Sequence, residues 1–286
     1  MARSRPDRCP GIVHPWPADD GGLVRIRVPG GRVTGTAMRA LAAVAEQYGD
    51  GRIRLTARAN LQLRAMPLTT DGLLAADALA ALTATGLLPS ARHDRVRNVL
   101  VSPQTGLAGG RTDLRPVLAA LDALLLAHDA LADLPGRFLF TLDDGRGDLA
   151  DRHKDLGLVA LDAHRAQLRV GAAWGEVVTL GDAPAALAEL ARRFLAVRGD
   201  GPAAPWHVDE LVLPLAPTAA PAPGAAVRTG ALGYGAVPGG EHLPVGDDGL
   251  GVADVAAWPA DTVVVTPWHG VLIPQQPQQP ILEESR

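Results

Sequence analysis

Cysteine is almost missing from this sequence, which has 286 residues and a single cysteine, Cys9. A [4Fe–4S] cluster takes four thiolates, and a structural zinc ion takes several Cys or His ligands at short spacing. One cysteine excludes an intrachain disulfide and excludes a cluster held by this chain alone. The eight histidines show no H-x-x-x-H pattern and no tight pairing, so the sequence predicts no metal site.

Lysine and long apolar runs are also lacking. Lys154 is the single lysine, and arginine supplies the other basic side chains, as high-GC coding bias favours. The formal net charge of −4 argues against a nucleic-acid partner. No run approaches the roughly 20 apolar residues of a membrane span, and no apolar segment follows the basic N-terminus as in a secretory signal. We therefore expect a cytoplasmic globular protein without a membrane partner.

Alternation and turn signals predict a β-α-β-β-α unit near the start of the chain. Residues 23–28 alternate apolar and basic side chains, as a half-buried strand does. Thr34 or Thr36 can cap a helix that runs to Tyr48. Short strands are expected over 52–56 and 61–65, and a second helix over 70–85. This order is typical of a ferredoxin-like unit.

The middle of the chain has the pattern of an α/β domain. Its expected strands cover residues 96–102, 138–142, 156–161 and 167–172, and its expected helices cover 114–132 and 183–197. Proline and alanine then indicate an extended linker. The predicted organisation is an N-terminal arm (1–22), a first ferredoxin-like half (23–92), a central α/β domain (93–200), a linker (201–226), a second half (227–274) and a tail (275–286).

Two parts of the sequence are similar to each other. Val-Pro-Gly-Gly occurs at 28–31 and 237–240, and a strand-Thr-x-bulky-x-small-strand pattern occurs around Thr56 and Thr266. Two half-units that cannot each bury a sheet face would pair into one core. The predicted fold class is α+β: two ferredoxin-like half-units pairing into one pseudo-symmetric domain, with the α/β domain inserted. A ligand at their junction would meet a Thr-x-Arg turn and a Thr-x-Trp turn.

The same segments resemble the successive motifs of sulfite and nitrite reductase hemoproteins. The motifs are Arg25–Gly31, Leu55–Gln62, Arg97–Val99 with Ser102-Pro103, Leu134–Phe138, and the glycine-containing pair 156–158 and 170–175. Cys9-Pro10-Gly11 and Thr266–Gly270 resemble the precorrin-3B synthase branch of that superfamily. The resemblance implies the superfamily's inserted α/β domain and a cleft that holds an anionic tetrapyrrole.

By this resemblance, eight residues are implied to bind the tetrapyrrole: Arg27, Arg58, Gln62, Arg97, Asn98, Arg137, Trp268 and His269. Planar guanidinium groups suit such a ligand because they bind carboxylates bidentately. No residue is implied as catalytic. The residues alone leave plainer explanations open: an arginine can face solvent from a strand or brace a loop, and a tryptophan is often a core side chain.

Two departures from the family pattern bear on chemistry. Leu139 stands where the reductases carry a second basic residue, which weakens the case for sulfite or nitrite as substrate. The family's cluster cysteines lie beyond the position of Pro274, where this sequence has a Gln/Pro-rich tail. We therefore expect any electrons to come from a separate cluster-bearing chain or an external donor.

Three functions follow for testing. The resemblance implies a precorrin-3B-synthase-like oxidoreductase of aerobic cobalamin biosynthesis. Such an enzyme binds precorrin-3A for O2-dependent ring hydroxylation, with family-type iron, and this chain would be incomplete on its own. The alternative is a non-catalytic tetrapyrrole-binding protein derived from a sulfite or nitrite reductase. The third is a remnant fold without a ligand.

Overall fold

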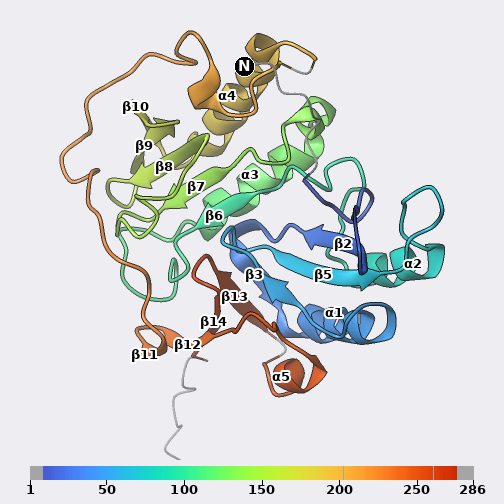
Figure 1. The fold of residues 1–286 in the computed structure, drawn as a ribbon. Helices are drawn as coiled ribbons and strands as arrows, with labels where there is room; N and C mark the ends of the chain where they lie inside the picture. The colour runs from blue at the N-terminus through green and yellow to red at the C-terminus, as the bar shows by residue number, and fades with distance from the viewer. Residues whose placement is uncertain (1–8, 202, 260, 276–286) are drawn as a thin grey trace, which may run out of the picture.

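Three β-sheets organise the computed structural model, which describes residues 9–201, 203–259 and 261–275 (Figure 1). The first sheet has the order β1-β2-β5-β4, built from β1 (Trp16–Ala18), β2 (Gly21–Ile26), β5 (Leu61–Met66) and β4 (Arg54–Leu55). The second has the order β11-β12-β14-β13-β3, built from β11 (Gly235–Val237), β12 (Gly240–Pro244), β14 (Gly270–Pro274), β13 (Thr262–Thr266) and β3 (Arg32–Thr34).

These two sheets repeat one topology. In chain order, β1, β2, β4 and β5 correspond to β11, β12, β13 and β14, and the correspondence gives the same neighbours in each sheet. The halves are also joined, because β3 of the first half pairs antiparallel with β13, and Ile53 bridges to Leu250. Side chains of both halves share one hydrophobic core. The α+β fold of paired ferredoxin-like halves predicted from the sequence is confirmed.

The helices of the halves follow from local sequence signals. At the start of α1 (Gly35–Tyr48) the Thr34 hydroxyl accepts a hydrogen bond from the Ala37 amide at 3.1 Å, as the capping pattern predicted. The second predicted helix was too long: α2 (Ala76–Ala84) begins later, because residues 69–75 form a turn with Gly72 at φ 76°. A short helix, α5 (Val252–Ala256), serves the second half. None of the helices in the described ranges is long and apolar enough to cross a membrane.

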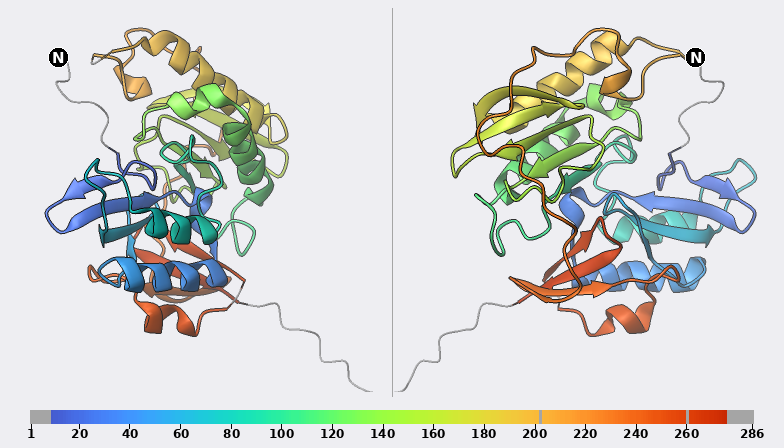
Figure 2. Two further views of the ribbon diagram at one scale, coloured as in Figure 1. Left: turned by 90° about the vertical axis from the view of Figure 1, so that its right-hand side faces the viewer. Right: turned by 60° about the vertical axis from the view of Figure 1, so that its left-hand side comes forward.

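The third sheet belongs to the central α/β part and has the order β10-β9-β8-β7-β6. Its strands are β6 (Val99–Val101), β7 (Phe140–Asp143), β8 (Leu156–Ala160), β9 (Arg165–Val170) and β10 (Ala173–Thr179). The first three run parallel, and β8, β9 and β10 are antiparallel. Helices α3 (Arg115–Ala127) and α4 (Ala183–Arg198) pack together and share a core with this sheet (Figure 2).

The predicted helix over 114–132 is interrupted. His128 has extended dihedral angles (φ −112°, ψ 103°), so α3 ends at Ala127 and a 3-10 turn, η2 (Asp129–Asp133), follows. Strands β1, β3, β10, β11 and β12 were not predicted. Of these, β1, β3 and β11 have three residues each, too few for an alternation pattern, β10 follows Gly171 at φ 55°, and β12 begins at Gly240 in a Pro-Gly-Gly string typical of a turn.

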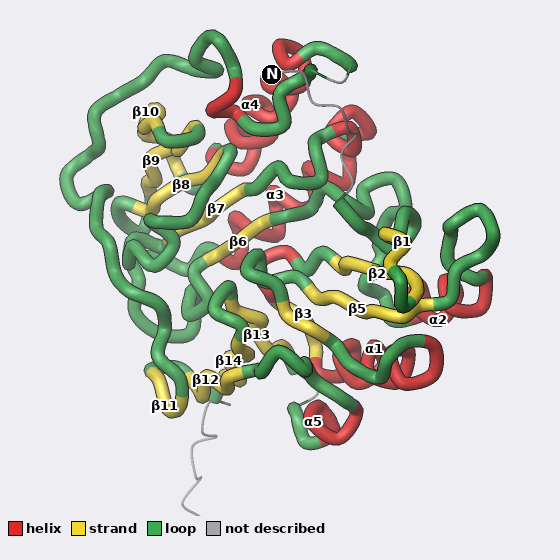
Figure 3. The backbone as a smooth tube through the Cα atoms, in the orientation of Figure 1, coloured by secondary structure: helices red, strands yellow, loops and turns green. Residues whose placement is uncertain are grey.

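A segment that we call the strap, residues 211–234, leads from the central part to β11 without helix or strand (Figure 3). It runs along the outside of the central sheet in Figure 1. Several hydrogen bonds attach it there: the Ala219 amide donates to the Trp174 carbonyl at 2.8 Å, and the side chain of Gln167 donates to the Ala220 carbonyl at 2.8 Å and accepts from the Ala222 amide at 2.7 Å. The strap thereby covers one edge of the central sheet.

Candidate functional site

Two matching turns lie at the junction of the three sheets. The first corner (Thr56–Asn60) connects β4 and β5, and the second corner (Thr266–Gly270) connects β13 and β14. Each places a non-glycine residue in the left-handed region three positions after its threonine, Ala59 at φ 54° and His269 at φ 57°. This shared backbone geometry supports the repeat predicted around Thr56 and Thr266.

The Val-Pro-Gly-Gly part of that predicted repeat is wrong. Residues 28–31 follow β2 and form a 3-10 turn, whereas residues 237–240 make the hairpin between β11 and β12. The structural counterpart of 237–240 is the turn between β1 and β2 at 18–21. Proline and two glycines suit many turns, so the matching letters did not mark matching positions.

Gly31 brings the backbones of the two halves close together. A β-carbon on Gly31 would lie 2.0 Å from the Val265 carbonyl oxygen and 3.3 Å from the β-carbon of Ala59. Its φ of 67° is also one that glycine adopts at little cost. Because Val265 precedes the second corner and Ala59 belongs to the first, the two corners lie near each other across Gly31.

Neutral amides attach the first corner to the central part. Asn60 Nδ2 donates to Asn98 Oδ1 at 2.9 Å, and Asn98 Nδ2 donates to the Gly136 carbonyl at 3.0 Å. The Val28 amide completes the network by donating to Asn60 Oδ1 at 3.2 Å. Both asparagines are about 1% exposed. Asn98, one of the predicted ligand residues, therefore has a structural role between two parts of the chain.

Four arginines gather at the first corner; we call Arg25, Arg27, Arg58 and Arg137 the arginine cluster. Arg58 Nη1 donates to the carbonyl of Arg137 at 2.8 Å, and Arg25 Nη2 donates to Oε1 of Gln62 at 2.9 Å. Burial lowers the pKa of Arg25, and the charges of Arg58 and Arg137 lower it further, while Cys9 opposes this. Positive charge is therefore concentrated where Arg27, Arg58, Gln62 and Arg137 were predicted to bind a ligand.

Arg25 and Arg27 of this cluster have buried hydrogen-bond donors that are unused. Arg27 is 4% exposed and donates to the Pro10 and Arg25 carbonyls. Burial lowers its pKa to about 10, although nearby Asp94 acts in the opposite direction. Among the described residues, the Nε atoms of Arg25 and Arg27 are buried without a hydrogen-bond partner. Buried unpaired donors are unfavourable, so an acceptor at this place would stabilise the site.

Arg97 differs from the arginine cluster in already having a carboxylate partner. Its Nε and Nη2 donate to Oδ1 and Oδ2 of Asp122 at 2.7 Å each, and Asp122 lies on α3. This bidentate ion pair joins the segment before β6 to α3, which packs against the central sheet. Arg97 thus has the bracing role that the sequence left open, and its guanidinium group is occupied.

The second corner carries an aromatic ring and an imidazole in place of a cation. Trp268 is half-buried and His269 is exposed. Arg152 of the central part donates to the Pro267 carbonyl at 3.0 Å and lies 5.8 Å from the centre of the Trp268 ring. The Tyr234 hydroxyl at the end of the strap donates to the Trp268 carbonyl. The structure therefore places Trp268 beside the central part and His269 next to it in the same turn, with neither in the arginine cluster.

A polar cavity of about 190 Å³ lies between the central sheet and the strap, and the sequence did not point to it. Three of its lining side chains are cationic: Lys154, Arg169 and Arg228. Burial lowers the pKa of Lys154 to about 8, and the charge of Arg169 adds to this effect. Arg169 is also stacked on Trp174, with 4.0 Å between the guanidinium carbon and the ring centre. In the sequence, only Lys154, the single lysine, just before the segment that forms β8, could have indicated this cavity.

Comparison with known proteins agrees with the sequence motifs. Residues 17–70 match the family model described as the nitrite/sulfite reductase ferredoxin-like half domain. A precorrin-3B synthase from Sinorhizobium sp is 42% identical over 66 residues, which make up 23% of this chain and 14% of that protein. A ferredoxin–nitrite reductase from Synechococcus elongatus is 35% identical over 134 residues, 43% of this chain and 25% of that protein.

A solved structure extends the likeness to nearly the whole chain. The Mycobacterium tuberculosis NirA protein superposes with a TM-score of 0.65 and 18% identity, over 97% of this chain and 58% of that one. At this identity the likeness is one of fold. The matched segments span a quarter or less of the two curated relatives. Residues 17–70 therefore match a nitrite/sulfite reductase ferredoxin-like half domain, and parts of the chain are similar to parts of a precorrin-3B synthase and a ferredoxin–nitrite reductase.

Proposed function

We propose that this chain binds a carboxylate-rich tetrapyrrole at the arginine cluster of the first corner. The observation that carries the proposal is the pair of buried, unpartnered Nε atoms on Arg25 and Arg27, next to Arg58 and Arg137. A ligand with several carboxylates supplies acceptors and negative charge together. Guanidinium groups match such carboxylates in geometry and stay charged.

The donor set fits an anionic macrocycle but does not fit an iron–sulfur cluster. The cluster takes four thiolates, and the sequence contains Cys9 alone. Leu139, whose backbone amide donates to Asp155, supplies no charge where the reductases carry a second base. Both facts favour a protein that holds a tetrapyrrole over one that reduces sulfite or nitrite by itself.

The reaction we propose is that of a precorrin-3B-synthase-like oxidoreductase in cobalamin biosynthesis. Precorrin-3A would be the tetrapyrrole, O2 the oxidant for ring hydroxylation, and a separate cluster-bearing chain or external donor the electron source. The 42% identity to a precorrin-3B synthase over 66 residues supports this choice. The alternative is a non-catalytic tetrapyrrole-binding protein, which the single cysteine favours.

A titration with uroporphyrin and with its methyl ester tests the binding step. The two probes share a ring and differ in charge, so the arginine cluster predicts a shift of the Soret band with uroporphyrin alone. Arg58→Ala should weaken binding by about 1–3 kcal/mol, the range for losing a charge-assisted contact. Arg192→Ala, which removes an exposed arginine of α4, is the matched control.

Two results would contradict the proposal. Equal affinity for the acid and the ester would show that carboxylates are not recognised. Equal affinity of the wild type and Arg58→Ala would move the site away from the first corner. Turnover is a separate test: precorrin-3A, O2 and a reductant, with and without a cluster-bearing chain, distinguish the oxidoreductase from the binding protein.

A further inference from the structure

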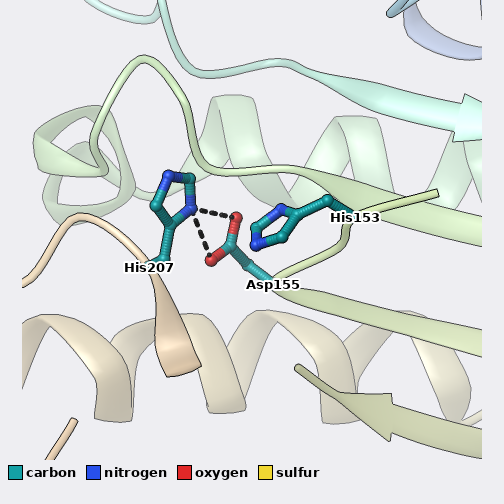
Figure 4. Close-up of side chains that lie close together, drawn as sticks. All are labelled: His153, Asp155 and His207. Carbon is teal, nitrogen blue, oxygen red and sulfur yellow. Dashed lines mark hydrogen bonds and ion pairs between the residues drawn. The ribbon is translucent and has the colours of Figure 1, made fainter. Parts of the chain in front are cut away.

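Three potential metal ligands meet at one end of β8: His153, Asp155 and His207 (Figure 4). One ligand atom from each can be chosen so that all lie within 4.8 Å of one another. Nδ1 of His207 lies 3.2 Å from Oδ1 and 3.3 Å from Oδ2 of Asp155. The imidazole rings of His153 and His207 are nearly perpendicular, with centres 4.7 Å apart.

The fold fixes the carboxylate and leaves one imidazole adjustable. Asp155 is fully buried, and its Oδ2 and Oδ1 accept the backbone amides of Leu139 at 2.8 Å and Val208 at 3.0 Å. These bonds hold the carboxylate in place, as the outer contacts of a metal ligand do. His207 is half-buried at the start of η3 (Val208–Glu210), and His153 is exposed.

We propose that His153, Asp155 and His207 bind one divalent transition-metal ion. Two imidazoles and one carboxylate suit ions such as Zn²⁺, Co²⁺ or Ni²⁺, whereas Mg²⁺ and Ca²⁺ prefer oxygen ligands alone. Ligand atoms about 2.1 Å from a metal stand about 3.0 Å apart at a right angle and about 3.4 Å apart in a tetrahedron. The separations between His207 and Asp155 fall in that interval.

The three ligand atoms lie within 4.8 Å of one another, so a small rotation of one side chain suffices to bring all three to the separations of a metal site. His153 supplies that movement because its side chain is exposed and can rotate onto the other two. Three protein ligands leave further coordination positions open for water.

The site would fasten a segment that is far away in the sequence. His207 lies 52 positions from Asp155, and its neighbour Trp206 lies under Arg137, with 5.4 Å between the guanidinium carbon and the ring centre. A bound ion would therefore hold the 206–210 segment against the central sheet beside the arginine cluster. The proposal does not depend on tetrapyrrole binding, because neither histidine belongs to that cluster.

Titration of the full chain, purified without a histidine tag, with Co²⁺ tests the site. Co²⁺ bound to nitrogen and oxygen ligands has visible d–d bands, and Zn²⁺ should displace it while Mg²⁺ should not. We expect saturation at one ion per chain. His153→Ala and His207→Ala should each weaken Co²⁺ binding by at least about tenfold, since even supporting residues of metal sites have effects of that size.

His164→Ala is the matched control, because His164 is exposed in the turn between β8 and β9, away from this group. It should bind Co²⁺ as the wild type does. Since His153 is exposed, its replacement tests the site without disturbing the core. The proposal is overturned if the wild type at submillimolar concentration gives no visible bands with one equivalent of Co²⁺, or if the His153 and His207 variants bind as tightly as the control.

Discussion

The first and second corners have the same backbone and different chemistry. Both place a residue in the left-handed region after a threonine, and both touch the central part of the chain. The first corner presents Arg58 and is held by two buried asparagines. The second presents Trp268 and His269 and is held by Arg152, which is half-buried and charged.

This difference shows how a duplicated unit can keep its fold while dividing its tasks. The backbone geometry that closes each sheet is retained in both halves, because each half still has to pair with the other. The side chains at the tips are under no such restriction. Four arginines gather at the first corner, whereas Arg152 contacts the second. We therefore place the proposed anion site in one half of the pseudo-symmetric frame.

The largest expected difference between the two corners is in how much their contacts with the central part contribute to the stability of the fold. Asn98→Ala removes the hydrogen bonds of the Asn98 side chain to the buried Asn60 amide and to the Gly136 carbonyl, so we expect a loss of about 2–4 kcal/mol in the free energy of unfolding. Arg152→Ala removes a half-buried contact to Pro267 and should cost about 1 kcal/mol or less. Urea unfolding measures both, and equal losses would show that the corners are attached with similar strength.

The second attachment should also depend on pH, through a carboxyl group beside Arg152. Burial raises the pKa of Asp148 to about 7, and the charge of Asp143 adds to the effect. The folded state therefore favours protonated Asp148. Its contribution to stability is complete below the usual aspartate pKa of about 4 and is lost as the pH rises through 7.

Asp148→Asn keeps an oxygen for the Ser102 hydroxyl but cannot ionise. We expect the wild type to lose on the order of 2 kcal/mol relative to this variant between pH 5 and pH 8, measured by urea unfolding at each pH. The network at Asn60 and Asn98 has no titratable group, so Asn98→Ala should cost the same at both pH values. Parallel pH profiles of the wild type and Asp148→Asn would contradict the assignment.

The smallest expected effects come from replacing Ala59 and His269, the two residues with left-handed backbone conformations. His269→Gly should stabilise the fold by about 0.5–1 kcal/mol, because glycine adopts a φ of 57° without steric cost. Ala59→Gly should be near neutral, because the same relief is offset by the loss of a buried methyl group, worth about 0.8 kcal/mol. Thermal unfolding compares the two, and equal shifts would mean that burial at Ala59 contributes nothing.

The sequence predicted the fold well where the signals were local. Alternation located β2 and β5, and Thr34 marked the start of α1. The prediction failed where a strand forms only through tertiary contacts. An example is β3, a three-residue strand that exists because β13 lies beside it. The Val-Pro-Gly-Gly match failed because turn residues are shared by unrelated turns.

The candidate site was predictable in part for similar reasons. The motifs named Arg27, Arg58 and Arg137, which the structure brings together with Arg25. They also named Arg97, whose partner Asp122 no local pattern could identify. The group of His153, Asp155 and His207 was invisible in the sequence because its third member comes from a distant loop.

Uroporphyrin binding by matched variants of the two corners tests directly whether the first corner holds the tetrapyrrole. We expect Arg58→Ala to weaken binding by about 1–3 kcal/mol relative to the wild type, and His269→Ala to change it by less than about 0.5 kcal/mol. A spectral titration of the Soret band gives both values. Equal weakening by the two variants, or none by either, would contradict a tetrapyrrole site built on the first corner.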